Sequence, residues 1–442
     1  MCDVYQKLPT GWYSPRLAEL GNIFTGTTPP TSDQSNYGGD LPFVGPSDLG
    51  GKRWVESCSD KLTKKGELLS RAAEKNAVFV SCIGILGKAG QTKEKTAFNQ
   101  QINAIQPDEK KIDPSFIYYA CTRLKPKLNT LAGLQVVPIV NKSLFSSLEI
   151  LAPKKLSEQR LIARILDTLD THIQKAEALI AKLEKVKEGL LHDLLTRGID
   201  ENGKLRPGPE QAPELYKESP LGLIPREWQA RPLSTAVKEV IPGAAIKSGE
   251  FSDTGKPVIA KSDVTGSKLI DIVNREQFVS LQAASLYSRS MVDEGAVVVS
   301  LRDLVPSGPT VGMGSIFYGK GVYILAQGTY GLYLKEELMT REFFSEITRR
   351  SWFRSQARGI TVGSTQVHAR SSEYVRIIIP IPALHEQIAI NERIRSLDEN
   401  ISAEKRALSE ASDLKKGLMD DLLTGRVRVT PLLEQAQATT PA

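Results

Sequence analysis

The sequence predicts an α+β protein in which two mixed α/β globular domains with twisted β-sheets are separated by two long helices that form an antiparallel coiled coil. Three observations support this fold, which has an internal pseudo-two-fold repeat. Segments 156–196 and 384–424 share 14 identical residues in 41 aligned positions without a gap. Apolar residues recur with heptad spacing in both segments. The remaining sequence contains short β-branched runs bounded by turns. An internal repeat of this kind decides how the rest of the chain is interpreted.

The duplication extends upstream of the helices, although less sharply. The segment 41–49 matches 256–264, and 76–81 matches 295–300, with offsets that drift from 215 to 228 as loops change length. We therefore expect six parts along the chain. These are a first globular domain at 1–153, a first helix at 154–197, a linker at 198–224, a second globular domain at 225–381, a second helix at 382–425 and a C-terminal tail at 426–442.

Each long helix carries an apolar seam, interrupted at matching positions by Lys187 and Lys415. A helix from Ser157 to Leu195 would be about 58 Å long at 1.5 Å per residue. Such a helix buries only one stripe, so the other copy is the expected partner. The alternative is two unrelated amphipathic helices, each packed on its own domain. The predicted seam consists of Leu166, Leu169, Ile173, Ile180, Leu183, Leu190, Leu194, Ile394, Leu397, Ile401, Leu408, Leu418 and Leu422.

The globular domains show the same order of expected elements. Strands are expected at 77–80, 101–105, 296–299 and 322–325, where β-branched residues cluster. One helix is expected in each domain, at Ser115–Leu131 and at Arg341–Ala357, followed by a glycine turn and a final strand at 148–151 or 375–379. The linker and the tail after Thr430 are rich in helix and strand breakers or polar residues, so no regular element is expected there.

Composition sets limits on the function. Lys and Arg number 57 against 51 Asp and Glu, which gives a net charge of +6, and the pI is near 8.9. This excess is compatible with a polyanionic partner, yet it does not establish one. Cys2, Cys58, Cys82 and Cys121 are too scattered for a disulfide framework or a zinc cluster. The sequence has no signal peptide and no apolar run long enough to span a membrane, so a cytoplasmic protein is expected.

No catalytic constellation is evident in the sequence. The segment 84–89 resembles a phosphate loop, but Cys82 stands where the first glycine is required and no Ser or Thr follows Lys88. None of the four histidines has a second ligand at metal-binding spacing. The predicted helix 341–357 is rich in arginine, which indicates either a solvated face or a face that contacts phosphates. We therefore expect no metal, no cofactor in this chain and no catalytic residue.

The order of globular domain, long helix, globular domain and long helix resembles the specificity subunit of type I restriction–modification systems. The resemblance covers essentially the whole chain. Its best-matched parts are the helix starts at 156–159 and 384–387, the strand end at 379–382 and the segment 98–104, which is typical of a target recognition domain. The second half departs from the last of these, with 325–330 in the corresponding region.

The resemblance implies a non-catalytic subunit that binds double-stranded DNA. Each globular domain would be a target recognition domain for one half of a bipartite, asymmetric site. The paired helices would fix the distance between half-sites and dock two modification (methyltransferase) subunits, and through them the restriction (translocase and nuclease) subunits. S-adenosylmethionine is expected on the modification subunits. The alternatives are a duplicated protein-interaction scaffold that dimerises through its coiled coil without binding DNA, and an independent enzyme, which the missing catalytic set argues against.

Polar side chains on loops are the expected readers of base edges, because Arg, Lys, Gln and Asn hydrogen-bond to them. The candidates in the first domain are Arg53, Lys88, Lys93, Lys95 and Gln100, and those in the second are Lys261, Arg289, Arg302, Gln327 and Arg370. For each of them an ordinary surface role is the competing interpretation.

Overall fold

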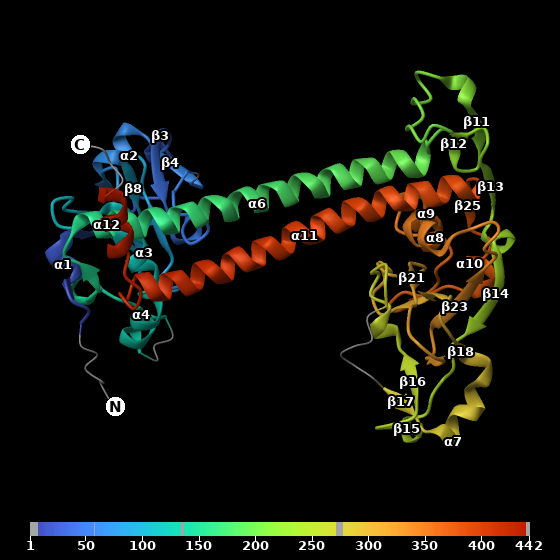
Figure 1. The fold of residues 1–442 in the computed structure, drawn as a ribbon. Helices are drawn as coiled ribbons and strands as arrows, with labels where there is room; N and C mark the ends of the chain where they lie inside the picture. The colour runs from blue at the N-terminus through green and yellow to red at the C-terminus, as the bar shows by residue number, and fades with distance from the viewer. Residues whose placement is uncertain (1–7, 57, 134–136, 271–276, 439–442) are drawn as a thin grey trace. The chain divides into compact units, whose positions relative to one another are not determined.

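The computed structural model describes residues 8–56, 58–133, 137–270 and 277–438, with side chains as far as 434. Cys2 lies outside the described residues. The chain divides into two compact units. Unit 1 comprises Met1–Leu179 and Glu404–Ala442, and unit 2 comprises Ile180–Ala403. Each unit contains one globular domain and a part of both long helices (Figure 1). The predicted α+β class is confirmed, since helices and sheets occur in both units.

Unit 1 is built on a four-stranded antiparallel sheet in the order β2-β9-β6-β7. A second sheet, β4-β3-β8-β5, contains the parallel pair β3 and β8. The two sheets share an apolar core that includes Val44, Phe79 and Phe98. The elements up to the first long helix are β1 Trp12–Tyr13, α1 Leu17–Leu20, β2 Gly21–Thr25, η1 Gln34–Asn36, β3 Tyr37–Val44, η2 Pro46–Asp48, β4 Asp60–Leu62, α2 Lys64–Leu68, β5 Ala72–Ala73, β6 Val78–Ser81, β7 Ala89–Gln91, β8 Thr96–Phe98, β9 Ile102–Pro107, α3 Pro114–Thr122, α4 Lys125–Ala132, α5 Lys142–Ser147, β10 Ala152–Pro153 and α6 Leu156–Thr196.

Unit 2 repeats this plan. Its antiparallel sheet has the order β14-β23-β19-β21, and its second sheet, β15-β17-β16-β22-β18, contains the parallel pair β16 and β22. Its elements up to the second long helix are η3 Pro213–Leu215, β11 Tyr216–Ser219, β12 Gly222–Pro225, β13 Gln229–Pro232, η4 Leu233–Thr235, β14 Val237–Pro242, η5 Ser248–Glu250, β15 Phe251–Ser252, β16 Lys256–Ile259, η6 Lys261–Asp263, β17 Phe278–Val279, α7 Leu281–Ala284, η7 Ser285–Ser290, β18 Met291–Val292, β19 Val297–Ser300, β20 Arg302–Asp303, β21 Gly314–Ile316, β22 Tyr323–Leu325, β23 Thr329–Leu334, α8 Arg341–Ile347, α9 Ser351–Gly359, β24 Val367–His368, α10 Ser371–Tyr374, β25 Ile378–Ile381 and α11 Leu384–Leu422.

The prediction of a single helix in each domain is wrong, because each predicted segment forms two helices, α3 and α4 in unit 1 and α8 and α9 in unit 2. In unit 2 the chain is extended at Arg350, with φ −75° and ψ 148°, and this residue separates α8 from α9. In unit 1 Pro126 stands in the first turn of α4, where its missing N–H costs nothing. The final strands also start later than expected, at Ala152 and Ile378, where they pair with β1 and β13.

Within each unit the two long helices run antiparallel. In unit 1 Lys415 of α11 forms an ion pair with Asp170 of α6. In unit 2 Lys187 of α6 forms an ion pair with Asp398 of α11. The two lysines that interrupt the seams thus have acidic partners at equivalent positions, since Asp170 and Asp398 are also related by the 228-residue shift. Burial raises the pKa of Asp398, but hydrogen bonds from Lys187 and Lys268 outweigh this effect and leave the pKa lowered.

The predicted seam residues lie on the buried side of these helices. Six of them are buried, namely Leu166, Ile180, Leu194, Ile394, Ile401 and Leu422. The remaining seven are half-buried, namely Leu169, Ile173, Leu183, Leu190, Leu397, Leu408 and Leu418. In the part of the chain that the structure describes, no helix is long and apolar enough to cross a membrane.

A cluster at the start of α11 fastens the linker to unit 2. The buried carboxylate of Glu386 accepts hydrogen bonds from the Ile199 backbone N–H at 2.8 Å and from Trp228 Nε1 at 2.9 Å, and it pairs with Arg206. Gly198 has a φ of +65°, and a Cβ there would lie 2.6 Å from the Trp228 ring. Only glycine fits this position.

Unit 1 has an equivalent cluster whose arginine comes from the end of the chain. Arg428 donates to Glu158 from Nε at 2.8 Å and from Nη2 at 3.1 Å. Gly425, with a φ of +71°, packs against Trp12. We call each set of Trp, Glu, Arg and Gly an anchor cluster. The C-terminal segment therefore completes unit 1 as the linker completes unit 2, and Figure 1 shows α12 among the elements of unit 1.

The expectation that the linker and the tail lack regular elements is wrong. Residues 216–225 form a hairpin in which β11 pairs with β12, and Pro220 and Gly222 lie at its turn. Breakers that exclude a helix are compatible with a tight turn between two short strands. The tail contains the helix α12, Thr430–Ala438, in which Pro431 falls in the first turn, where proline is tolerated.

Candidate nucleic-acid interface

Three loops meet at one end of the sheets in each domain. Loop A comprises residues 45–49 and 260–264, loop B comprises 82–88 and 301–312, and loop C comprises 98–101 and 326–329. In unit 1 the Cys82 N–H of loop B donates to the Gln101 carbonyl of loop C at 2.8 Å. In unit 2 the Leu301 N–H donates to the Gly328 carbonyl at 3.0 Å. The same backbone hydrogen bond thus joins loops B and C in both domains.

The last residue of the strand before loop A is joined to loop C by a second matched hydrogen bond. The Asn99 N–H donates to the Val44 carbonyl at 3.0 Å, and the Ala326 N–H donates to the Ile259 carbonyl at 2.9 Å. Each loop A also forms the same turn. The Asp48 carboxylate accepts from the Gly45 N–H at 2.8 Å, and the Asp263 carboxylate accepts from the Ala260 N–H at 2.7 Å. These backbone hydrogen bonds are therefore matched in the two domains, whereas the length of loop B and the side chains on the loops differ.

In unit 2 four of the five candidate residues are brought together by these loops. Lys261 lies on loop A and its Nζ is 3.3 Å from Asp303 Oδ1 on loop B. Arg302 lies on loop B, beside Gly328 of loop C, and Gln327 precedes that glycine. Arg370 follows Ala369, whose N–H donates to the Leu301 carbonyl at 2.8 Å. Arg302, Gln327 and Arg370 are exposed, so their side chains are available to a ligand.

Asp303 holds loops A and B of unit 2 together. Its carboxylate accepts from the Thr310 hydroxyl at 2.8 Å and pairs with Lys261. Burial raises the pKa of Asp303, but the hydrogen bonds from Thr310 and the charge of Lys261 leave the pKa lowered overall. The carboxylate therefore stays ionised and partly neutralises Lys261. Arg289, the fifth candidate, is exposed on η7, outside the three loops.

In unit 1 the structure places two of the five candidates on these loops. Lys88 is half-buried at the end of loop B, with its Nζ 3.4 Å from the Pro46 carbonyl of loop A. Gln100 is exposed on loop C and accepts a hydrogen bond from the Thr28 hydroxyl. Lys93 and Lys95 lie in the turn between β7 and β8, where they form ion pairs with Glu56 and Glu67 respectively.

Arg53 is part of the interior of unit 1. It is 5% exposed, and its guanidinium donates to Gln91 at 2.8 Å, to Ser115 and to Asp167 on α6. The face of the guanidinium lies over the Trp54 ring at 4.3 Å. All three guanidinium nitrogens thus have partners in the protein, which fits a residue that fastens α6 to the globular domain. Sequence reasoning could not see these partners, because Asp167 is 114 residues away.

Because only polar side chains are expected as base contacts from the sequence, two exposed apolar side chains on loop B are missed. Ile85 is 63% exposed and Leu304 is 61% exposed, and each lies four residues after the serine that ends the preceding strand. Apolar side chains contact the methyl group of thymine in the major groove. The matching position after Ser81 and Ser300 is the signal that would have identified them.

The buried thiols of unit 1 are not suited to nucleophilic chemistry. Burial raises the pKa of Cys82 to about 11 and that of Cys121 to about 12. The reactive form of cysteine is the thiolate, so both side chains are protonated at neutral pH. Among the described residues, no three His, Cys, Asp or Glu side chains are grouped so that they could hold a metal ion.

Comparison with known families matches both halves of the chain to one domain type. The type I restriction modification DNA specificity domain matches residues 9–185 and again residues 225–411. The chain belongs to this family. The two matches contain the two globular domains together with most of both long helices, so the repeat read from the sequence is a duplication of the family domain.

Relatives of known type are similar over almost the whole length. The chain is 24% identical to the MjaVIII type I restriction enzyme specificity subunit of Methanocaldococcus jannaschii over 432 residues, which cover 96% of this chain and 95% of that relative. Among solved structures, the HsdS subunit from Thermoanaerobacter tengcongensis aligns with a TM-score of 0.52 at 18% identity, covering 97% of this chain and 100% of that one. The S subunit from M. genitalium aligns with a TM-score of 0.56 at 15% identity, covering 96% and 98% respectively. These structures share the fold of the specificity subunit.

Proposed function

We propose that this DNA specificity subunit reads a bipartite, asymmetric sequence, with loops A, B and C of each globular domain facing one half-site. The observation that carries this proposal is the matched three-loop end of the two domains. Equivalent backbone hydrogen bonds hold the loops in both, while the exposed side chains on them differ. A duplicated frame with different side chains suits the recognition of two different half-sites, because base readout depends on the side chains that reach the groove.

The chain is proposed to act without chemistry of its own. Two modification subunits would dock on the paired helices and supply the S-adenosylmethionine site, and restriction subunits would join through them. Residue types at the loops support binding, since Arg302, Gln327 and Gln100 are exposed hydrogen-bonding groups. The purified chain is expected neither to methylate nor to cleave DNA, and to bind S-adenosylmethionine negligibly. Methyl transfer by a preparation shown to be free of partner subunits would contradict this.

Base readout is tested by truncating one exposed side chain on loop B. Arg302→Ala, in a complex reconstituted with the modification subunits, is expected to weaken binding of the cognate site by about 1–3 kcal/mol and to relax specificity at one position. The matched control is Arg289→Ala, because Arg289 is an exposed arginine of the same unit that lies outside the three loops. Binding is measured on a panel of duplexes that differ by one base pair. Uniform weakening across the panel would make Arg302 a phosphate contact, and an equal effect of both variants would refute the assignment of the loops.

A further inference from the structure

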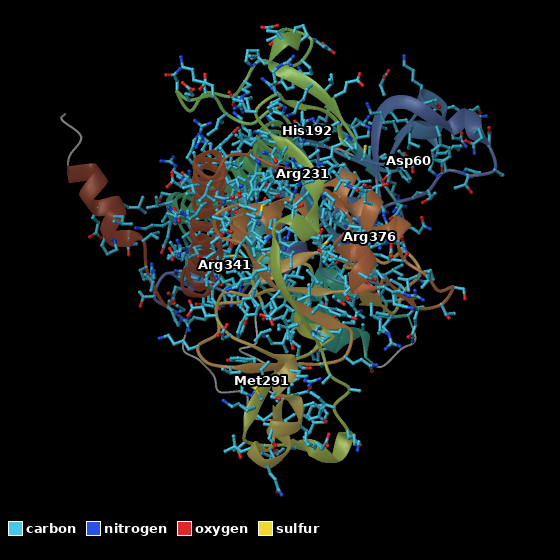
Figure 2. All side chains as sticks on the ribbon, turned by 90° about the vertical axis from the view of Figure 1, so that its right-hand side faces the viewer. Asp60, His192, Arg231, Met291, Arg341 and Arg376 are labelled. Carbon is cyan, nitrogen blue, oxygen red and sulfur yellow. The ribbon has the colours of Figure 1, made fainter. Side chains whose placement is uncertain are left out.

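A cavity of about 400 Å³ lies in unit 2, between the end of α6 and the start of α9. Its walls carry four guanidinium groups, those of Arg349, Arg350, Arg354 and Arg358. Among the residues that line it, Glu188 is the one carboxylate, and its side chain is 74% exposed and pairs with Arg350 at 3.2 Å. His192 also belongs to the lining and is labelled in Figure 2. The cavity therefore has a strong excess of positive charge.

Two arginine nitrogens in this region are buried without a hydrogen-bond partner. They are Nη2 of Arg349 and Nε of Arg350. An unpaired buried donor is destabilising, and more so when it is charged. Arg354, in contrast, is fixed by the carbonyls of Gly308 at 2.8 Å and Pro309 at 2.9 Å. One side of the cavity wall is thus held by backbone carbonyls of loop B, and two unpaired guanidinium nitrogens lie buried within the arginines of the other side.

The first turn of α9 adds further donors. This nine-residue helix begins at Ser351, and the side chain of its N-cap residue Arg350 makes no capping hydrogen bond. The N-terminus of a helix attracts anions through its free N–H groups and its dipole. Burial lowers the pKa of Arg349. The charge of Glu346 raises this pKa and the charge of Arg350 lowers it, and the pKa stays below its usual value overall. An anion in the cavity would offset the repulsion between the Arg349 and Arg350 charges.

The equivalent place in unit 1 is neutralised by the protein itself. Asp113 and Thr340 are the N-cap residues of α3 and α8, and the backbone N–H of each donates to a glutamine of a long helix. These two equivalent residues are 227 positions apart. The same offset makes Arg123 of unit 1 the counterpart of Arg350 of unit 2. Arg123 forms an ion pair at 3.1 Å with Asp420. By the 228-residue shift Asp420 corresponds to His192, so unit 2 has an imidazole where unit 1 has a carboxylate.

We infer that the cavity at Arg349, Arg350 and Arg358 is a binding site for the phosphate group of a ligand. Arginine forks match phosphate oxygens in geometry and in charge. The volume lies within the range of about 300–1,000 Å³ for small-molecule sites, which leaves room for more than the phosphate itself. Trp352 in the lining supplies an apolar surface for the group that carries it. This inference goes beyond the proposed base readout, because it concerns phosphate binding in a cavity that adjoins loop B through Ser307 and Pro309.

The test is a calorimetric titration of the full chain with inorganic phosphate, in chloride buffer at constant ionic strength. Saturable binding of one phosphate per chain is expected. Arg358→Gln and His192→Asp should each weaken it about tenfold or more. The first removes a charge-assisted hydrogen bond to the phosphate, and the second places a negative charge beside it. His192→Asn should retain binding, since it adds no charge. Arg376→Gln is the control, because Arg376 is 73% exposed and lies apart from His192 in Figure 2.

Competition distinguishes the two sources of phosphate. If a DNA duplex without the target sequence displaces the inorganic phosphate, the occupant is a backbone phosphate of DNA. If the duplex leaves phosphate bound and a mononucleotide displaces it, the occupant is a small phosphorylated ligand. Circular dichroism of each variant tests whether it is folded, and both His192 and Arg358 are exposed. Absence of saturable phosphate binding, or equal binding by His192→Asp and His192→Asn, would overturn the inference.

Discussion

Replacing Glu386 by alanine is expected to loosen the attachment of the linker to unit 2. The carboxylate is 3% exposed and satisfies the Ile199 N–H, the Trp228 indole N–H and Arg206. Its removal leaves two buried neutral donors unpaired, each at about 1–3 kcal/mol. Arg206 keeps its ion pair with Glu227 at 2.7 Å, so its charge is only partly uncompensated. The loss should total about 3–5 kcal/mol, the range for breaking a buried ion pair.

The equivalent substitution in unit 1, Glu158→Ala, provides the matched comparison. Trp12 Nε1 is buried without a partner, so it loses nothing when Glu158 is removed. The side chain of Arg428 is 27% exposed and can regain water. The cost should therefore be smaller, about 1–2 kcal/mol.

Native-state hydrogen exchange followed by mass spectrometry measures both effects locally. In Glu386→Ala the peptide that contains Ile199 and Arg206 should exchange about a hundredfold faster or more, because about 1.4 kcal/mol corresponds to a factor of ten. Glu386→Gln should fall between the variant and the wild type, since its amide oxygen still accepts from Trp228. Acceleration below about fivefold, or equal acceleration at the two anchor clusters, would refute this account of how the linker is held.

Three further outcomes are expected. Insertion of one heptad after Ala181 and one after Ser409 should keep both half-site sequences and lengthen the spacer by about three base pairs, because about 10.5 Å of helix is added. Methylation mapping measures the spacing between half-sites. Retention of the original spacing would exclude the helices as the elements that set this distance. Asp398→Asn should lower the free energy of unfolding at pH 7 by about 1 kcal/mol. The pKa of Asp398 is lowered in the folded protein, so the stabilisation by its carboxylate is present above the pKa of the unfolded state, about 3.9, and is lost as the pH falls through the folded-state pKa. The difference in free energy of unfolding between variant and wild type, measured by urea titration, should therefore vanish in that acid range. A fragment of residues 1–211 should form a symmetric dimer that, together with modification subunits, recognises a palindromic site. A fragment that ends at residue 200 should form a less stable dimer, because it lacks Arg206, the counterpart of Arg428. A folded monomer of the longer fragment in sedimentation would contradict this prediction.

The parts of the fold that repeat along the chain could be predicted from the sequence. The long helices and the duplication follow from the heptad spacing and from identities between segments, which are visible without a structure. The break between α8 and α9 could not be predicted, because the extended conformation of Arg350 reflects tertiary contacts and the local sequence contains no proline or glycine there. Tertiary packing overrides a weak helical propensity at such a position.

The candidate site was predictable only in part for a similar reason. Backbone hydrogen bonds between loops that are distant in sequence bring together Lys261, Arg302, Gln327 and Arg370. From the sequence alone, these residues are selected only because they are polar and lie near predicted turns. The same choice also selected Arg53, whose partner Asp167 is distant in sequence. Charge and a nearby turn do not distinguish an exposed arginine from one that is buried against a helix.

The anchor cluster of unit 1 has a consequence for the order in which the protein folds during synthesis. Glu158 pairs with Arg428, which is 270 residues later, and unit 1 also needs residues from Glu404 onwards. Unit 2 is continuous in sequence and can complete itself earlier. At about 5–20 residues per second, the first domain waits on the order of ten seconds to a minute on the ribosome for its last part. During that time the apolar stripe on the part of α6 that belongs to unit 1 is uncovered, so the domain that is made first is the one that is finished last.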